Sequence, residues 1–145
     1  MKKLLHIFMM AGLILLMITA CSDDKLYYNY TFTGESESWS AEYIQKASEK
    51  PAKQDGKDAY YEPTQSYTFE LKYKGDPGDL ENIKQFKYGY KTTGTSTILT
   101  QDGPPAAGQL ESKGNGEIIL REDAVISVDV EWDGKSEQFE LRIGE

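Results

Sequence analysis

The pattern that most constrains the fold is a strict alternation of apolar and polar side chains in the middle of the chain. Residues 67–74 show it most clearly, with apolar side chains at Tyr67, Phe69, Leu71 and Tyr73. Successive side chains of a strand point to opposite faces, so a period of two residues indicates a half-buried β-strand. The same alternation in residues 38–43 and 86–91 predicts two further strands.

The C-terminal segment predicts a β-hairpin. Asp133-Gly134 is a dipeptide favoured in two-residue type I′ turns, because both central positions have positive φ. With that turn, apolar residues pair across the two strands: Val128 with Phe139, Ile126 with Leu141 and Ala124 with Ile143. A slip of one residue would put these side chains on different faces, so the register is well specified.

The remaining segments predict short elements joined by loops. Residues 98–99 and 118–120 predict short strands, and residues 80–84 a single helical turn. Residues 45–66 are polar and contain Pro and Gly, which indicates a long loop. A loop of that length is unusual in a compact domain, so a short edge strand at Tyr60 and Tyr61 is the alternative. Residues 114–116 indicate a turn. About six to eight strands and no long helix predict an all-β, antiparallel β-sandwich, with an immunoglobulin-like topology as one form. A barrel is the alternative.

The first twenty residues predict a secretory signal peptide of the lipoprotein type. Lys2 and Lys3 precede an apolar run over residues 4–18, which is short for a membrane-spanning helix of about 20 residues. The sequence Ile18-Thr19-Ala20-Cys21 resembles the lipobox of bacterial lipoproteins, which implies cleavage before Cys21 and lipid on its thiol. We therefore expect a signal peptide at 1–20, a lipidated tether at 21–30 and a β-sandwich domain at 31–145.

This processing predicts that the protein is located on the extracytoplasmic face of the cell membrane and that the lipid on Cys21 anchors it there. Stable attachment needs more than one acyl chain, which such processing supplies. An ordinary signal peptide or an uncleaved membrane helix is the alternative. Residues 22–24 (SDD) also resemble the acidic signal that sends some Bacteroidetes lipoproteins to the cell surface, but a solvated polar linker is the preferred explanation.

Cleavage also limits the chemistry of the domain. It removes Lys2 and Lys3, so residues 21–145 hold 14 basic and 24 acidic side chains, a net charge of −10. That balance opposes nucleic-acid binding, which requires basic surfaces. The single histidine, His6, leaves with the signal, and Cys21 is the single cysteine. We therefore expect neither a His/Cys metal site nor a histidine-activated nucleophile, and no cofactor.

Two groups of carboxylates raise the question of calcium, which prefers oxygen ligands. Asp129, Glu131 and Asp133 recur at two-residue spacing, and Asp76 and Asp79 lie in a turn. A solvated sheet face and turn-forming aspartates are the commoner explanations of these residues, and a flat strand does not curl round an ion as a calcium loop does, so no metal site is expected.

Tyrosine is concentrated in the first two thirds of the domain, since all ten lie between residues 27 and 90. Those that alternate with polar residues are expected in the core, as are Trp39 and Trp132. Tyr60 and Tyr61 are adjacent in a polar segment, and neighbouring residues of an extended chain cannot face the same core. They are therefore the predicted exposed contact, because exposed aromatic side chains are enriched in binding surfaces.

Both ends of the domain show a family resemblance. Residues 34–39 (GESESW), followed by Ala41 and Tyr43, resemble the start of the mature domain in small lipoproteins of Bacillus-like Firmicutes. Residues 128–141, with EWDGK at 131–135, resemble the last hairpin of the same group. The resemblance implies a lipoprotein with a single β-sandwich domain and supplies no active site.

These observations favour a non-enzymatic domain that is anchored to the membrane and binds a protein or a cell-envelope component. The alternative is a cell-envelope hydrolase that uses carboxylates alone. A glycosidase needs two carboxyl groups roughly 5–9 Å apart, so this alternative predicts such a pair in a cleft.

Overall fold

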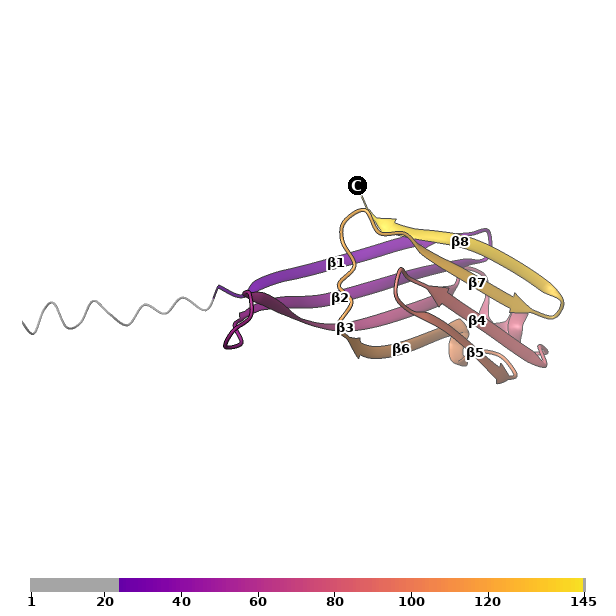
Figure 1. The fold of residues 1–145 in the computed structure, drawn as a ribbon. Coiled ribbons are helices and arrows are strands. Elements are labelled where there is room, and N and C mark those ends of the chain that lie inside the picture. Colours follow the sequence, from indigo (N-terminus) through magenta and orange to yellow (C-terminus); the bar gives the residue numbers. More distant parts are fainter. Residues whose placement is uncertain (1–23, 145) are drawn as a thin grey trace, which may run out of the picture.

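The computed structural model describes residues 24–144 (Figure 1). The predictions for residues 1–23, which include cleavage and lipidation at Cys21, lie outside the described residues. The described chain is all-β and antiparallel, as predicted. Its eight strands between residues 26 and 143 are β1 (Leu26–Glu35), β2 (Trp39–Ala52), β3 (Tyr60–Tyr73), β4 (Gln85–Lys91), β5 (Ser96–Asp102), β6 (Gln109–Gly116), β7 (Ile126–Trp132) and β8 (Lys135–Ile143).

The strands form one continuous sheet that folds over on itself. Their order is β5-β4-β7-β8-β1-β2-β3-β6, and β1 and β8 share only two residue pairs, Phe32 with Ile143 and Thr33 with Arg142. The sheet curls at this narrow junction, so that β4, β7 and β8 pack against β1, β2 and β3 as a second layer (Figure 1). The immunoglobulin fold has two separate sheets, whereas these two layers stay connected through β1 and β8.

Aromatic side chains fill the space between the layers. The ring of Trp39 on β2 lies 5.1 Å from that of Phe86 on β4 and 5.5 Å from that of Trp132 on β7. Phe69 on β3 stacks on Tyr90 of β4 at 4.3 Å. Both tryptophans are therefore core residues, as predicted, and the alternation at residues 67–73 correctly identified the buried face of β3.

The C-terminal hairpin has the predicted turn and register. Asp133 and Gly134 have φ values of 45° and 75°, and Val128 and Ile126 pair with Phe139 and Leu141. The predicted pairing of Ala124 with Ile143 is wrong, because β7 begins at Ile126. Ile143 instead pairs with Phe32 of β1.

The long loop predicted at 45–66 is also wrong. β2 and β3 pair over fourteen positions, from Trp39 with Tyr73 to Ala52 with Tyr60, which leaves only residues 53–59 as the connection. The polar sequence led to a wrong prediction of a loop, because the distant half of this hairpin extends past the second layer of the sandwich. Its side chains therefore need not be apolar, although the backbone hydrogen bonds continue.

Two further predictions, next to and within the edge strand β6, are wrong. Residues 114–116 lie inside β6 rather than in a turn, and residues 118–120 belong to a loop at 117–125 rather than to a strand. β6 pairs only with β3, so one ladder of backbone hydrogen bonds stabilises a strand of polar sequence. The helical turn predicted at residues 80–84 instead covers Pro77–Leu80, and it begins where Asp76 accepts a hydrogen bond from the Gly78 amide at 2.9 Å. A second short helical turn, Ala106–Gly108, precedes β6.

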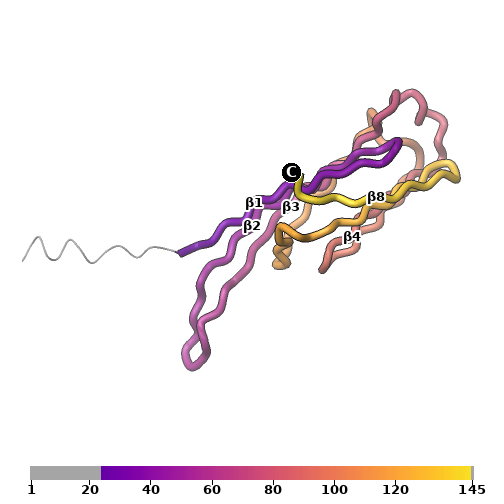
Figure 2. The backbone as a smooth tube through the Cα atoms, turned by 90° about the horizontal axis from the view of Figure 1, so that it is seen from above, coloured from indigo at the N-terminus to yellow at the C-terminus, as the bar shows by residue number. Residues whose placement is uncertain are grey.

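The hairpin of β2 and β3 projects from the sandwich together with the start of β1 (Figure 2). We call this projection the arm and define it as residues 24–30 and 46–66. Strand β1 begins at Leu26, within the segment predicted as a tether, and Leu26 pairs with Glu49 of β2. Within residues 24–144, no helix is long and apolar enough to cross a membrane.

Candidate functional site

The arm carries most of the large apolar side chains that residues 24–144 expose. Seven such side chains are exposed in this part of the chain. Four of them lie on the arm: Leu26 (46%), Tyr27 (69%), Tyr60 (44%) and Tyr61 (55%). Ile98 and Leu99 on the edge strand β5 and Ile118 in the 117–125 loop complete the set. This concentration makes the arm the main candidate for a binding surface.

Tyr60 and Tyr61 lie at the end of the arm. Tyr60 pairs with Ala52 and Tyr61 with Pro51, and adjacent strand residues project from opposite faces. Tyr61 shares the face of the core residues of β3, while Tyr60 shares the outer face with Tyr27. The Tyr60 hydroxyl donates a hydrogen bond to Glu62 at 3.2 Å, which raises the pKa of Tyr60. Both predicted residues are exposed, and a contact there stays a prediction.

A charged cluster supports the inner face of the arm. The Tyr28 hydroxyl donates a hydrogen bond to Glu49 Oε2 at 2.8 Å, and Arg121 Nη2 donates one to Glu49 Oε1 at 2.6 Å. The Arg121 guanidinium lies 4.5 Å from the centre of the Tyr28 ring, within the range of a cation–π interaction. The hydrogen bond from Tyr28 lowers the pKa of Glu49, and Arg121 lowers it further. The cluster connects β1, β2 and the 117–125 loop.

A buried glutamine holds the same loop from the core side. Gln45 is fully buried; its Nε2 donates to the Leu120 carbonyl at 3.0 Å, and its Oε1 accepts from the Leu120 amide at 2.8 Å. Gln65 also donates to Gln45 Oε1, at 3.2 Å. Gln45 was not among the residues predicted to matter, although its position two residues after Tyr43 continues the alternation that begins at Trp39. A polar side chain at an inward position requires a partner.

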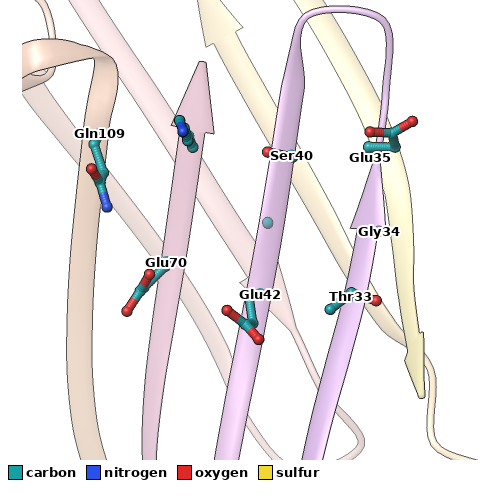
Figure 3. A pocket seen from close by; sticks show the side chains of 9 residues that line it. Thr33, Gly34, Glu35, Ser40, Glu42, Glu70 and Gln109 are labelled. Carbon is teal, nitrogen blue, oxygen red and sulfur yellow. The ribbon is translucent and has the colours of Figure 1, made fainter. Parts of the chain in front are cut away.

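The outer face of β1, β2, β3 and β6 contains a shallow depression of about 440 Å³ (Figure 3). Glu42 of β2 and Glu70 of β3 lie side by side in it and are directly paired across the two strands. Side chains in such pairs have Cβ atoms roughly 5 Å apart, and like charges in this position repel each other. Glu111 pairs with Glu70 from the other side and forms an ion pair with Lys113 at 2.7 Å. This carboxylate pair was not singled out from sequence, because its members are far apart in the chain.

Three of the five acidic residues considered for calcium interact with protein groups. Asp129 accepts a hydrogen bond from Gln138, Glu131 forms an ion pair with Lys87 at 2.8 Å, and Asp76 caps the helical turn. Among residues 24–144, no three His, Cys, Asp or Glu side chains gather closely enough to hold a metal ion.

Comparisons of the chain with protein-family models, with curated proteins and with solved structures found no match.

Proposed function

We propose that this protein is a membrane-anchored bacterial lipoprotein with a non-enzymatic β-sandwich domain that binds a protein or a cell-envelope component through its arm. The observation that carries the binding proposal is the arm itself, with four exposed large apolar side chains at one end of the molecule. Aromatic residues such as tyrosine dominate binding surfaces, because they bring large contact areas at low conformational entropy.

The anchoring part of the proposal is supported by the sequence around Cys21, which resembles a lipobox. Leu26, the first residue of β1, follows Cys21 by only five residues. A fully extended chain of that length spans at most about 17 Å. A lipid on Cys21 would therefore keep the domain close to the bilayer.

Two measurements test these parts separately. Labelling of growing cells with a radioactive lipid precursor should mark the wild-type protein and leave Cys21→Ser unlabelled; equal membrane retention of both would contradict the anchor. For the binding surface, a photo-crosslinking amino acid at Tyr61 should give a specific adduct in cells. The same group at Gln138, on the outer face of β8, is the control, and identical adducts at both positions would contradict a role for the arm.

A second candidate function is a carboxylate-based hydrolase of the cell envelope. The observation that favours it is the Glu42–Glu70 pair in the outer depression, since a retaining glycosidase uses two carboxyl groups about 5 Å apart. If this function holds, the purified protein should solubilise labelled cell-wall material, and Glu70→Gln should abolish that activity. Glu111→Gln is the matched control, because Glu111 already has Lys113 as its partner.

A further inference from the structure

The arm differs from the rest of the domain in charge. It contains five lysines and five acidic residues, so its net charge is zero. The other described residues contain 9 basic and 17 acidic side chains, a net charge of −8. An anionic lipid surface repels the acidic sandwich but not the neutral arm. The arm is therefore the part of the domain that can approach such a surface most closely.

The residue types on the arm are those found where proteins meet the membrane–water boundary. Tyrosine is enriched there, because its ring is apolar and its hydroxyl remains hydrated. Lysine buries its alkyl stem and keeps its ammonium group in water. The arm provides Tyr27, Tyr60 and Tyr61 as exposed aromatic rings, together with Lys25, Lys46, Lys50, Lys53 and Lys57.

The direction of the arm agrees with this composition. Leu26, five residues after the proposed anchor in the sequence, pairs with Glu49, so residues 50–62 extend the hairpin beyond the part of β2 that β1 pairs with. We call residues 50–62 the tip. The three residue pairs from Lys50–Glu62 to Ala52–Tyr60 add about 10 Å of strand at roughly 3.3 Å per residue, and the connection at 53–59 lies beyond them. The tip therefore lies at the same end of the molecule as the start of β1, the strand that follows the proposed anchor in the sequence (Figures 1 and 2).

We infer that the tip of the arm rests on the lipid surface to which the protein is anchored, as a second and non-covalent membrane contact. This inference depends on the proposed lipidation of Cys21, and it names membrane lipid as the envelope component that the arm contacts. Attachment at two points orients the sandwich. The turn at 133–134 between β7 and β8 lies at the end of the sandwich away from the tip (Figure 1), and this end then faces away from the membrane.

Fluorescence quenching by lipid tests the inference. The processed, lipidated protein is incorporated into vesicles of phosphatidylglycerol and phosphatidylcholine whose acyl chains carry bromine, a short-range quencher. Tyr61→Trp and Tyr60→Trp each place a reporter on one face of the tip, and Gln138→Trp places one on the outer face of β8. The native Trp39 and Trp132 are buried in the core, so the unsubstituted protein provides the background signal.

We expect brominated lipid to remove about half or more of the added fluorescence of a reporter at the tip, as for tryptophan at an interface, and to leave the reporter on β8 unchanged. Quenching of either tip reporter supports the inference. If the protein floats with the vesicles but neither tip reporter is quenched, or if the β8 reporter is quenched equally, the inference is overturned while the anchor stands. If the protein does not float with the vesicles, the anchor fails and the inference fails with it.

Discussion

Replacing Gln45 by Met removes the hydrogen bonds that hold the 117–125 loop against β2. Methionine has a similar length and fills a similar volume, so the change removes polar atoms with little effect on packing. The amide and the carbonyl of Leu120 each lose a partner at about 3 Å. A buried polar group left without a partner costs about 1–3 kcal/mol. Two such groups set an upper range of about 2–6 kcal/mol, and partial release of the loop lets water reach them. We therefore expect the free energy of unfolding to fall by about 2–4 kcal/mol.

Urea denaturation followed by the fluorescence of the buried tryptophans measures this change, and amide hydrogen exchange at Leu120 shows whether the loop opens locally. Gln65→Met is the graded control. It removes one hydrogen bond to Gln45 and one to Tyr43, both at 3.2 Å and only partly buried, so a loss of about 1 kcal/mol is expected. Gln138→Met, on the exposed face of β8, should change stability by less than about 0.5 kcal/mol.

The reasoning is refuted if Gln45→Met changes the free energy of unfolding no more than Gln138→Met does and leaves the Leu120 amide equally protected. In that case the two hydrogen bonds would be replaced without cost, and the loop would be held by its other contacts. Hydrogen exchange that rises at Leu120 alone, with global stability reduced by the smaller end of the range, shows local release and agrees with the argument.

Three further predictions concern charge and protonation. Glu70→Gln should stabilise the fold by about 0.2–1 kcal/mol in urea denaturation at neutral pH, because it removes a like charge opposite Glu42; a gain that persists in 1 M salt would contradict the electrostatic cause. Burial opposes the ionisation of Glu137, but hydrogen bonds from the β1–β2 turn outweigh it and lower its pKa. Its contribution to stability is therefore present above its unfolded pKa and lost as pH falls, so Glu137→Gln should flatten the loss of stability between about pH 5 and 3; an unchanged acid profile would count against this role. The hydrogen bond with Tyr90 raises the pKa of Tyr67 to about 12, so stability should fall as pH rises from about 10 towards that value. Tyr67→Phe should reduce this alkaline loss, measured by circular dichroism, and an equally steep loss in the variant would refute the assignment.

The parts of the fold that were predicted correctly depend on local rules. The alternation at residues 67–73 requires only that one face of a strand be buried. The register of the last hairpin follows from a turn that requires positive φ at Asp133 and Gly134. The sequence did not predict strand β6, because an edge strand can be stabilised by backbone hydrogen bonds to one neighbouring strand without an alternation of apolar and polar side chains. Its neighbour β3 lies about forty residues earlier in the chain.

The candidate site likewise has features that local sequence predicts and features that depend on distant contacts. The exposure of Tyr60 and Tyr61 was predictable, since adjacent residues of a strand cannot both enter one core. The contact between Gln45 and Leu120 joins residues 75 positions apart, and the Glu42–Glu70 pair depends on the register of a hairpin predicted as a loop. No local pattern specifies such contacts, because they arise only when the sheet curls and the strands pair.

The arm is the part of the fold whose existence is least explained by the burial of its own side chains. Beyond Gln45, β2 continues for seven residues, of which only Ala47 and Ser48 are buried. A short β-ribbon without a covering layer is marginally stable in water. Here β1 widens it to three strands, and Gln45 and Arg121 hold one loop over its base, but the tip has no such cover. Tyr60 and Tyr61 remain 44% and 55% exposed there, so the fold buries only part of each ring. The proposed membrane contact would take up these rings, and it would account for both the length of the arm and the residues at its end.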